Sequence, residues 1–211
     1  MGKTGLIHHC FHLLHQADPQ IPTIYIDIYH THNLAEFVNV FASSVLGRFD
    51  SAPQKALERA ARFVKSCRPT LTFDEYTGKP KISVDFVPEK AEHTLKEIFE
   101  YLGSFDHRCC IAFDEFQQIG RYPETGVEAL LRSYIQFAHN THFIFSGSNQ
   151  HMMEDIFISP RRPFYQSTQI MGLGSIPADD YFNFASYGFA QIGKRFQFGG
   201  QPASDQRIYY F

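Results

Sequence analysis

The sequence has no tryptophan, no excess of positive charge and no long apolar run. Its 211 residues include 19 Lys and Arg against 22 Asp and Glu, which gives a formal net charge of -3. No overall positive field therefore draws the chain toward nucleic acid or an anionic membrane. No apolar stretch approaches the roughly 20 residues that a membrane helix needs, and the N-terminus has no signal-peptide apolar region. These absences predict a cytoplasmic protein without a membrane partner.

Cysteine is also scarce, and its spacing contains no CxxC pair. Of Cys10, Cys67, Cys109 and Cys110, the adjacent two lie in an apolar run typical of a buried strand. We expect reduced cysteines in the core of a cytosolic protein. Apolar residues are abundant by contrast: they make up 44% of the chain and include 22 Phe and 11 Tyr. That is enough apolar material for one sizeable core.

Short β-rich runs alternate with amphipathic helical patterns along the chain, which is typical of an α/β fold. The runs IPTIYIDIY, CCIAFDEF and HFIFSGS predict strands, and the second, which is almost wholly apolar, predicts a strand covered on both faces. A further strand is expected over 168–173. Helices are expected over 3–16, 34–45 with Asn33 as N-cap, 57–64, 94–102, 127–139, 151–157 and 178–192.

A β-hairpin is predicted as an insertion on this core, over about 69–88. The runs TLTFDEY and KISVDFV flank Thr77-Gly78-Lys79-Pro80, whose residue types favour a tight turn. We expect residues 1–198 to form one core and residues 199–211 to begin a further region. The helical pattern DQRIYYF stops at the last residue, so we also expect the C-terminus to be cut.

Gly2-Lys3-Thr4, at the head of an amphipathic helix, is the end of the phosphate-loop motif GxxxxGK[ST]. In that loop, backbone N–H groups hold phosphate oxygens, the lysine reaches the β and γ phosphates, and the hydroxyl ligates Mg²⁺. The triplet alone would arise by chance in roughly one chain of this length in ten. We expect Met1 to be an internal methionine or a misplaced start, because the missing segment would include the central strand of the sheet.

Two later strands end in polar residues of the kind that an ATPase site needs. Asp114-Glu115 follows an apolar strand, where one carboxylate can hold the Mg²⁺ shell and the other can orient the attacking water. Ser148 and Asn149 end the next strand, where a polar side chain would lie near a γ phosphate. A solvated acidic loop and a plain strand-to-turn transition are the alternatives. Three elements in the required order favour the functional interpretation.

With these elements the sequence resembles the archaeal-type ATPases of the AAA-like, STAND-related P-loop class. The resemblance runs through GKTGLI, IYIDIY, the hairpin, CIAFDEFQQI, FIFSGSN and RRPFYQSTQIMGLGSIP, so it covers nearly the whole chain. It implies a P-loop NTPase fold of the ASCE type, a three-layer sandwich with a mostly parallel sheet. It also implies Mg²⁺-dependent ATP binding and hydrolysis that drives a conformational switch, and a C-terminal winged-helix region that this sequence lacks.

The resemblance assigns roles to single residues. Phosphate binding falls to Gly2, Lys3, Thr4 and Gly5, Mg²⁺ to Thr4 and Asp114, water activation to Glu115, and γ-phosphate contact to Ser148 or Asn149. Arg161 and Arg162 are candidates for an arginine finger that stabilises transition-state charge. The flanking prolines favour an exposed or salt-bridged turn instead.

Other sites and other functions compete with this interpretation. His8, His12 and His15 share one helix face and could hold a transition metal, but no carboxylate or cysteine completes the set nearby, which favours a solvated face. Basic residues over 59–68 lack an aromatic platform, so nucleic acid is not expected as a partner. The main rival to an ATPase is a nucleotide-independent remnant of the fold that binds a protein partner or itself.

Overall fold

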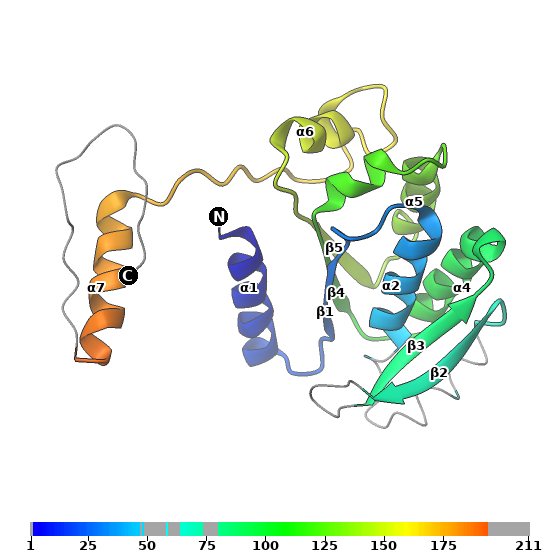
Figure 1. The fold of residues 1–211 in the computed structure, drawn as a ribbon, viewed down its shortest axis with the longest axis horizontal. Coiled ribbons are helices and arrows are strands. Elements are labelled where there is room, and N and C mark those ends of the chain that lie inside the picture. The colour runs from blue at the N-terminus through cyan, green and yellow to red at the C-terminus, as the bar shows by residue number, and fades with distance from the viewer. Residues whose placement is uncertain (1, 47, 49–57, 59–63, 74–79, 194–211) are drawn as a thin grey trace. The chain divides into compact units, whose positions relative to one another are not determined.

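The computed structural model describes residues 2–46, 48, 58, 64–73 and 80–193 of the chain. The chain forms two compact units, residues 1–170 and residues 171–211. The first unit contains the sheet, the hairpin and helices α1, α2 and α4 to α6, and the second contains α7 (Figure 1).

The sheet positions the candidate site because its strands all end at one edge. It consists of β1 (Thr23–Asp27), β4 (Cys109–Asp114) and β5 (Thr141–Phe145) in the order β1-β4-β5. Both pairs are parallel, with Asp27 opposite Asp114 and Phe113 opposite Phe145. The carboxyl ends of parallel strands form the edge where open α/β sheets bind ligands. The predicted α/β fold with a parallel sheet is confirmed, and each strand is shorter than its apolar run.

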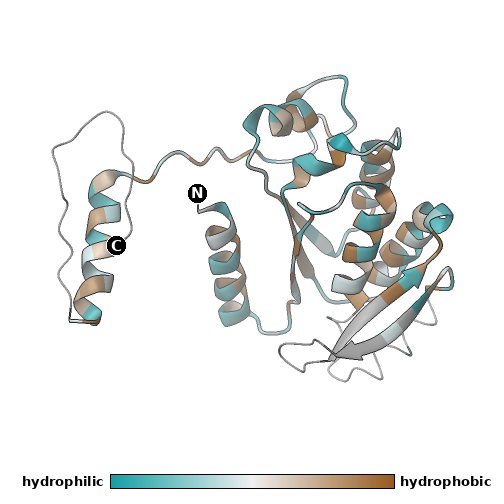
Figure 2. Cartoon of the chain, in the orientation of Figure 1, coloured by the Kyte–Doolittle hydropathy of each residue, from teal (hydrophilic) through white to brown (hydrophobic). Residues whose placement is uncertain are grey.

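One face of the sheet is covered by α1 (Lys3–Ala17), close to the helix predicted over 3–16. Ile7 and Phe11 are its buried residues, and they pack in one cluster with Cys110 and Ala112 of β4. The rest of α1 is mostly hydrophilic, as its teal colour shows (Figure 2). This single apolar stripe fixes α1 along the sheet, with its N-terminus toward the edge where the strands end.

The opposite face is covered by α2 (Leu34–Leu46) and α4 (Ala91–Gly103), with α5 (Val127–Ile135) in the same core (Figure 1). As predicted, Asn33 caps α2, because its Oδ1 accepts the backbone N–H of Glu36 at 2.8 Å. β4 is buried along its whole length, as its apolar run predicts. The central strand is therefore held from both sides.

Phe113 lies at the centre of an aromatic cluster on this second face. Its ring centroid lies 5.5 Å from that of Phe37 and 5.4 Å from that of Phe41. It stacks on Phe143 and Phe145 of the neighbouring strand. Each such pair contributes about 0.5–1.5 kcal/mol beyond area burial. Phe113 directly precedes Asp114, so the same packing that stabilises the core also fixes the position of that carboxylate.

A hairpin lies where the sequence predicts one. β2 (Cys67–Phe73) and β3 (Pro80–Phe86) form an antiparallel pair. Asn39 of α2 fastens it to the core by donating from Nδ2 to the backbone carbonyl of Val84 at 3.1 Å. The predicted turn residues 77–79 and nearly all of the helix expected over 57–64 lie outside the described residues.

The strand predicted over 168–173 is wrong. Residues 168–177 have no regular structure, and Ile170, Met171 and Leu173 are exposed. No described strand pairs with this segment. A β-rich composition forms a strand only where a neighbouring strand and a packed face support it, and this segment has neither.

The second unit contains α7 (Ala178–Gln191), which begins after Pro177 with Asp179 and Asp180 in its first turn. Acidic residues at a helix N-terminus complement the helix dipole. Several of its aromatic side chains are exposed, among them Phe184. None of the described helices is long and apolar enough to cross a membrane. All four cysteines are free thiols, and all but the half-buried Cys10 are buried.

Candidate functional site

The first two predicted pieces of the site meet at one carboxylate oxygen. Asp114 is the last residue of β4 and is almost completely buried, and Thr4 lies in the first turn of α1. The Thr4 hydroxyl donates to Asp114 Oδ2 at 2.6 Å, across 110 residues of sequence. The structure therefore brings together the end of the GKT triplet and the first acid of the acidic pair.

The N-terminus of α1 presents backbone donors beside this contact. The helix begins after Gly2, which has a left-handed backbone with φ of 119°, and no side chain caps it. The Gly2 carbonyl accepts the N–H of Leu6 at 2.8 Å. The N–H groups of the first turn have no partner within the helix, and together with the helix dipole they favour an anion. Lys3, half-buried, and the exposed Gly5 belong to the same turn.

Tyr25 is a site residue that the sequence interpretation missed. It lies on β1, and its hydroxyl donates to the same Asp114 Oδ2 at 2.6 Å. Burial, and then the hydrogen bond to Asp114, raise the pKa of Tyr25 to about 12, so the hydroxyl keeps its proton as a donor. The signal was present in IPTIYIDIY: alternation places Tyr25 on the face opposite to the buried Ile24 and Ile26, toward α1.

These donors keep Asp114 ionised. Burial raises the pKa of its carboxyl, but the hydrogen bonds from Thr4, Tyr25 and the Glu115 backbone N–H outweigh burial and hold the pKa below its usual range. An ionised carboxylate beside a threonine hydroxyl is a pair of hard oxygen donors, the ligand type that Mg²⁺ prefers. The donor set at Thr4 and Asp114 thus fits the metal that the sequence interpretation expects.

Glu115 turns away from the sheet immediately after Asp114. Its backbone is left-handed, with φ of 57°, and it leads into η2 (Phe116–Arg121). A non-glycine residue in this region costs roughly 1–2 kcal/mol. Two backbone hydrogen bonds hold the turn: Phe116 N–H donates to the Ser146 carbonyl and Ser146 N–H to the Phe113 carbonyl, each at 2.8 Å. This turn separates the side chain of Glu115 from that of Asp114.

The polar residues after β5, which are the third predicted piece of the site, contact the acidic pair at Glu115. Ser148, just after β5, donates from its hydroxyl to Glu115 Oε2 at 2.6 Å. Gln117 of η2, which the sequence interpretation did not single out, donates from Nε2 to the same oxygen at 2.5 Å. The two predicted acids thus belong to separate hydrogen-bond groups, one toward α1 and one toward the turn after β5.

Asn149 and Arg162 have structural partners, whereas Arg161 is an exposed residue. Asn149 is the N-cap of α6 (Gln150–Ile158), where its Oδ1 accepts the N–H of Met152 at 3.1 Å. Arg162 forms ion pairs with Glu128 at 3.1 Å and Asp155 at 3.0 Å, while Arg161 is exposed. These ion pairs favour the salt-bridged turn over a finger for Arg162.

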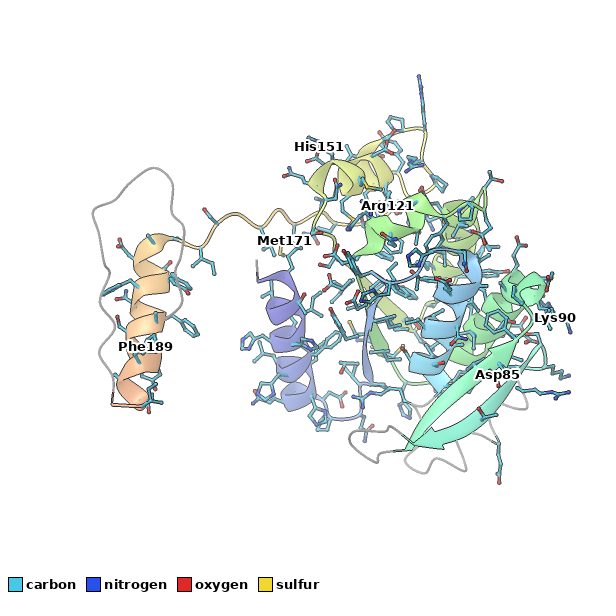
Figure 3. All side chains as sticks on the ribbon, in the orientation of Figure 1. Asp85, Lys90, Arg121, His151, Met171 and Phe189 are labelled. Carbon is cyan, nitrogen blue, oxygen red and sulfur yellow. The ribbon has the colours of Figure 1, made fainter. Side chains whose placement is uncertain are left out.

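The elements that follow Glu115 and Ser148 in the sequence, η2 and α6, pack against each other. Arg121, the last residue of η2, approaches Met152 of α6, with Nη2 3.9 Å from Sδ. Figure 3 labels Arg121 and His151 on these two elements. Gly147, in the turn after β5, lies close to both Gln117 of η2 and Met153 of α6.

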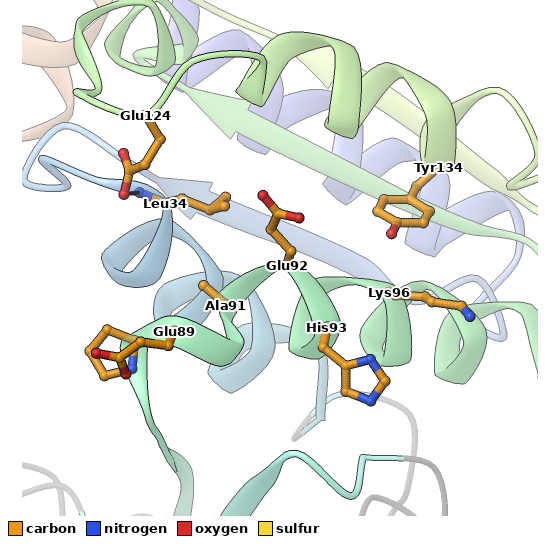
Figure 4. A pocket seen from close by; sticks show the side chains of 9 residues that line it. Leu34, Glu89, Ala91, Glu92, His93, Lys96, Glu124 and Tyr134 are labelled. Atoms are coloured by element: carbon orange, nitrogen blue, oxygen red, sulfur yellow. Dashed lines mark hydrogen bonds between the residues drawn. The ribbon is translucent and has the colours of Figure 1, made fainter.

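A pocket of about 490 Å³ lies apart from these groups and shares no residue with them. The side chains of Glu92 and Tyr134 point into it from α4 and α5 (Figure 4). Glu124 also lines it and accepts the backbone N–H of Leu34 at 3.2 Å. Burial raises the pKa of Tyr134, and Glu92 adds to that rise.

The histidine face of α1 remains a solvated one in this structure. His8, His12 and His15 are exposed, and the His8 ring lies 4.7 Å from that of Tyr25. Within the part of the chain that the structure describes, no three His, Cys, Asp or Glu side chains are grouped so that they could hold a metal ion.

Comparisons with known proteins agree with the architecture. No family model matches the chain, and no curated protein matches it significantly. Among solved structures, a Walker-type ATPase of Pyrococcus abyssi is similar to 83% of this chain at 18% sequence identity, with a TM-score of 0.50. The chain spans 48% of the length of that protein. At this identity the likeness concerns the fold alone: the chain shares its α/β architecture with a parallel sheet with that protein.

Proposed function

We propose that the protein binds ATP with Mg²⁺ and hydrolyses it. The observation that carries the proposal is the hydrogen bond between Thr4 and Asp114. It joins a helix N-terminus, which suits phosphate, to an ionised carboxylate at a strand end, which suits a divalent cation. Both features support a nucleotide site, and both lie at the sheet edge where open α/β sheets bind ligands.

The first turn of α1 would hold the phosphates. The backbone N–H groups of Gly2, Lys3, Thr4 and Gly5 and the Lys3 ammonium are the donors on this side. Lys3 would neutralise charge on the β and γ phosphates, which is its role in the phosphate-loop motif. When bound, Mg²⁺ would supply further charge neutralisation, and the Thr4 hydroxyl and the Asp114 carboxylate are the side chains that would hold it.

Glu115 would orient and deprotonate the attacking water. Its Oε2 accepts from Ser148 and Gln117, which leaves Oε1 as the oxygen that can accept a proton from water. Ser148 or the amide of Asn149 would contact the γ phosphate. The reaction is attack of water on the γ phosphorus, and charge stabilisation by positioned groups supplies most of the catalysis.

The solved ATPase of similar fold supports the proposal as an analogy, since fold alone does not establish function. Hydrolysis would act as a conformational switch. The competing function is a nucleotide-independent interaction module, for which the exposed aromatic residues of α7 offer a surface.

Calorimetric titration of Mg²⁺-ATP tests the proposal. It is made on the 211-residue chain and on a chain extended upstream through a whole phosphate loop, with Asp114→Asn as the control in each. Binding that Asp114→Asn weakens supports a nucleotide site at Thr4 and Asp114. Absence of binding by both wild-type chains overturns the proposal in favour of the interaction module.

A further inference from the structure

Gln117 of η2 is a buried polar residue whose amide contacts Glu115. Its side chain is 5% exposed, and its Nε2 donates to Glu115 Oε2 at 2.5 Å. The direction of the amide is set by charge, because the opposite orientation would place Oε1 against a carboxylate oxygen. The donor end of Gln117 therefore faces Glu115.

The oxygen end of the same amide lies against the turn after β5. Gln117 Oε1 is buried and has no hydrogen-bond partner among the residues that the structure describes. A Cβ atom on Gly147 would lie 2.3 Å from it, which is closer than any real contact. Glycine at position 147 is thus what allows the amide to occupy this place. A buried carbonyl without a partner costs about 1–3 kcal/mol, so what the amide contributes at this position is its donor end, which faces Glu115.

Ser148 and Gln117 differ in what they can do once nucleotide is bound. A serine hydroxyl has one hydrogen to donate. If Ser148 donates it to the γ phosphate, as proposed above, it no longer donates to Glu115. Gln117 Nε2 has a second acceptor in Ser148 Oγ, but at 3.5 Å this contact is 1 Å longer than the one to Glu115 Oε2 at 2.5 Å. Glu115 would then be held by Gln117.

We propose that Gln117 is a positioning residue for Glu115, which holds Oε2 so that Oε1 faces the attacking water while Ser148 is engaged by nucleotide. The inference rests on the proposed ATPase function. It assigns Gly147 a supporting role, since any side chain there displaces the amide. The two donors then have different roles: Ser148 contacts the nucleotide, and Gln117 holds Glu115, the general base, in position.

The test compares two adjacent buried glutamines. Gln117→Met keeps the length of the side chain and removes the donor to Glu115. Gln118→Met is the matched control, because Gln118 is 8% exposed and donates from Nε2 to the Thr31 carbonyl at 3.0 Å, away from Glu115. Steady-state kinetics, the Kd for Mg²⁺-ATP and the Tm are measured for wild type and both variants.

We expect Gln117→Met to lower kcat roughly tenfold to a hundredfold, the loss of one hydrogen bond to a charged group, with KM and Kd within twofold of wild type. Gln118→Met should leave kcat within twofold. Gly147→Ala is the second variant: its Cβ would lie 2.3 Å from Gln117 Oε1 and 2.5 Å from Met153 Sδ, so it should displace the amide and lower kcat in the wild-type chain.

The outcomes separate the two proposals. A wild-type chain that binds no Mg²⁺-ATP and shows no turnover, in the 211-residue and the extended form alike, overturns the ATPase proposal and this inference with it. Turnover by wild type with an unchanged kcat in Gln117→Met overturns this inference alone. An equal loss of kcat in Gln118→Met also overturns it, since that result would show a general effect of packing in η2.

Discussion

Tyr25→Phe tests one of the hydrogen bonds to Asp114, because it removes the hydroxyl of Tyr25 and leaves the ring in place. The lost interaction is a hydrogen bond to an ionised carboxylate, and such bonds contribute about 1.5–3 kcal/mol. Tyr25 is partly exposed, which places the effect near the lower end. We therefore expect a loss of about 1–2 kcal/mol at pH 7, or a fall in Tm of about 2–8 °C for a chain of this size.

The same variant has a defined pH dependence. The pKa of Asp114 is below its usual range in the folded chain. A carboxyl of this kind adds stability above its unfolded pKa of about 4 and loses it as the pH falls through the folded value. The hydroxyl of Tyr25 donates to the ionised form. The difference between wild type and Tyr25→Phe should thus be complete above about pH 5 and should shrink below about pH 4.

Urea unfolding at a series of pH values measures this difference. Tyr29→Phe is the control, because Tyr29 is 56% exposed and no hydrogen bond from its hydroxyl to Asp114 exists in the described structure. Its effect should stay below about 0.5 kcal/mol at every pH. The reasoning is refuted if Tyr25→Phe and Tyr29→Phe behave alike at pH 7, or if the effect of Tyr25→Phe is the same at pH 7 and pH 3.

Three further variants test the site and the core. Glu115→Gln should retain Mg²⁺-ATP binding by calorimetry and lower turnover at least tenfold, and normal turnover would remove Glu115 from the mechanism. Lys3→Ala should weaken ATP binding, and an unchanged Kd would show that the first turn of α1 is not the phosphate site. Phe113→Ala should destabilise the fold by about 3–5 kcal/mol, measured by urea unfolding, because its ring is 1% exposed within the aromatic cluster. A loss below about 1 kcal/mol would show that this cluster relaxes around the cavity.

Sequence patterns predicted the parts of the fold that local physics controls. The three apolar runs became parallel strands, and the Asn33 cap and the hairpin pair are where they were expected. The resemblance assigned both Thr4 and Asp114 to Mg²⁺, which requires the two side chains to lie close together, and their hydroxyl and carboxylate are hydrogen-bonded.

What the patterns missed depends on contacts between distant segments. In the sequence, Tyr25 is one of several residues that favour a strand. Strand alternation and the position of α1 together direct its hydroxyl to Asp114. Gln117 reaches the Glu115 side chain because the backbone at Glu115 is left-handed. No neighbouring glycine in the sequence indicates a turn of this kind. The strand expected over 168–173 failed because a strand needs a partner, which composition does not supply.

The left-handed backbone at Glu115 affects how mutations there must be interpreted. A β-branched residue such as valine opposes this conformation, so Glu115→Val would disturb the turn and carry Gln117 and Ser148 with it. A loss of activity in that variant would then measure backbone geometry instead of the carboxylate. Asparagine and glycine adopt the left-handed region readily. Glu115→Asn and Glu115→Gly therefore join Glu115→Gln, which is not β-branched, as substitutions that remove the acid while keeping the course of the chain.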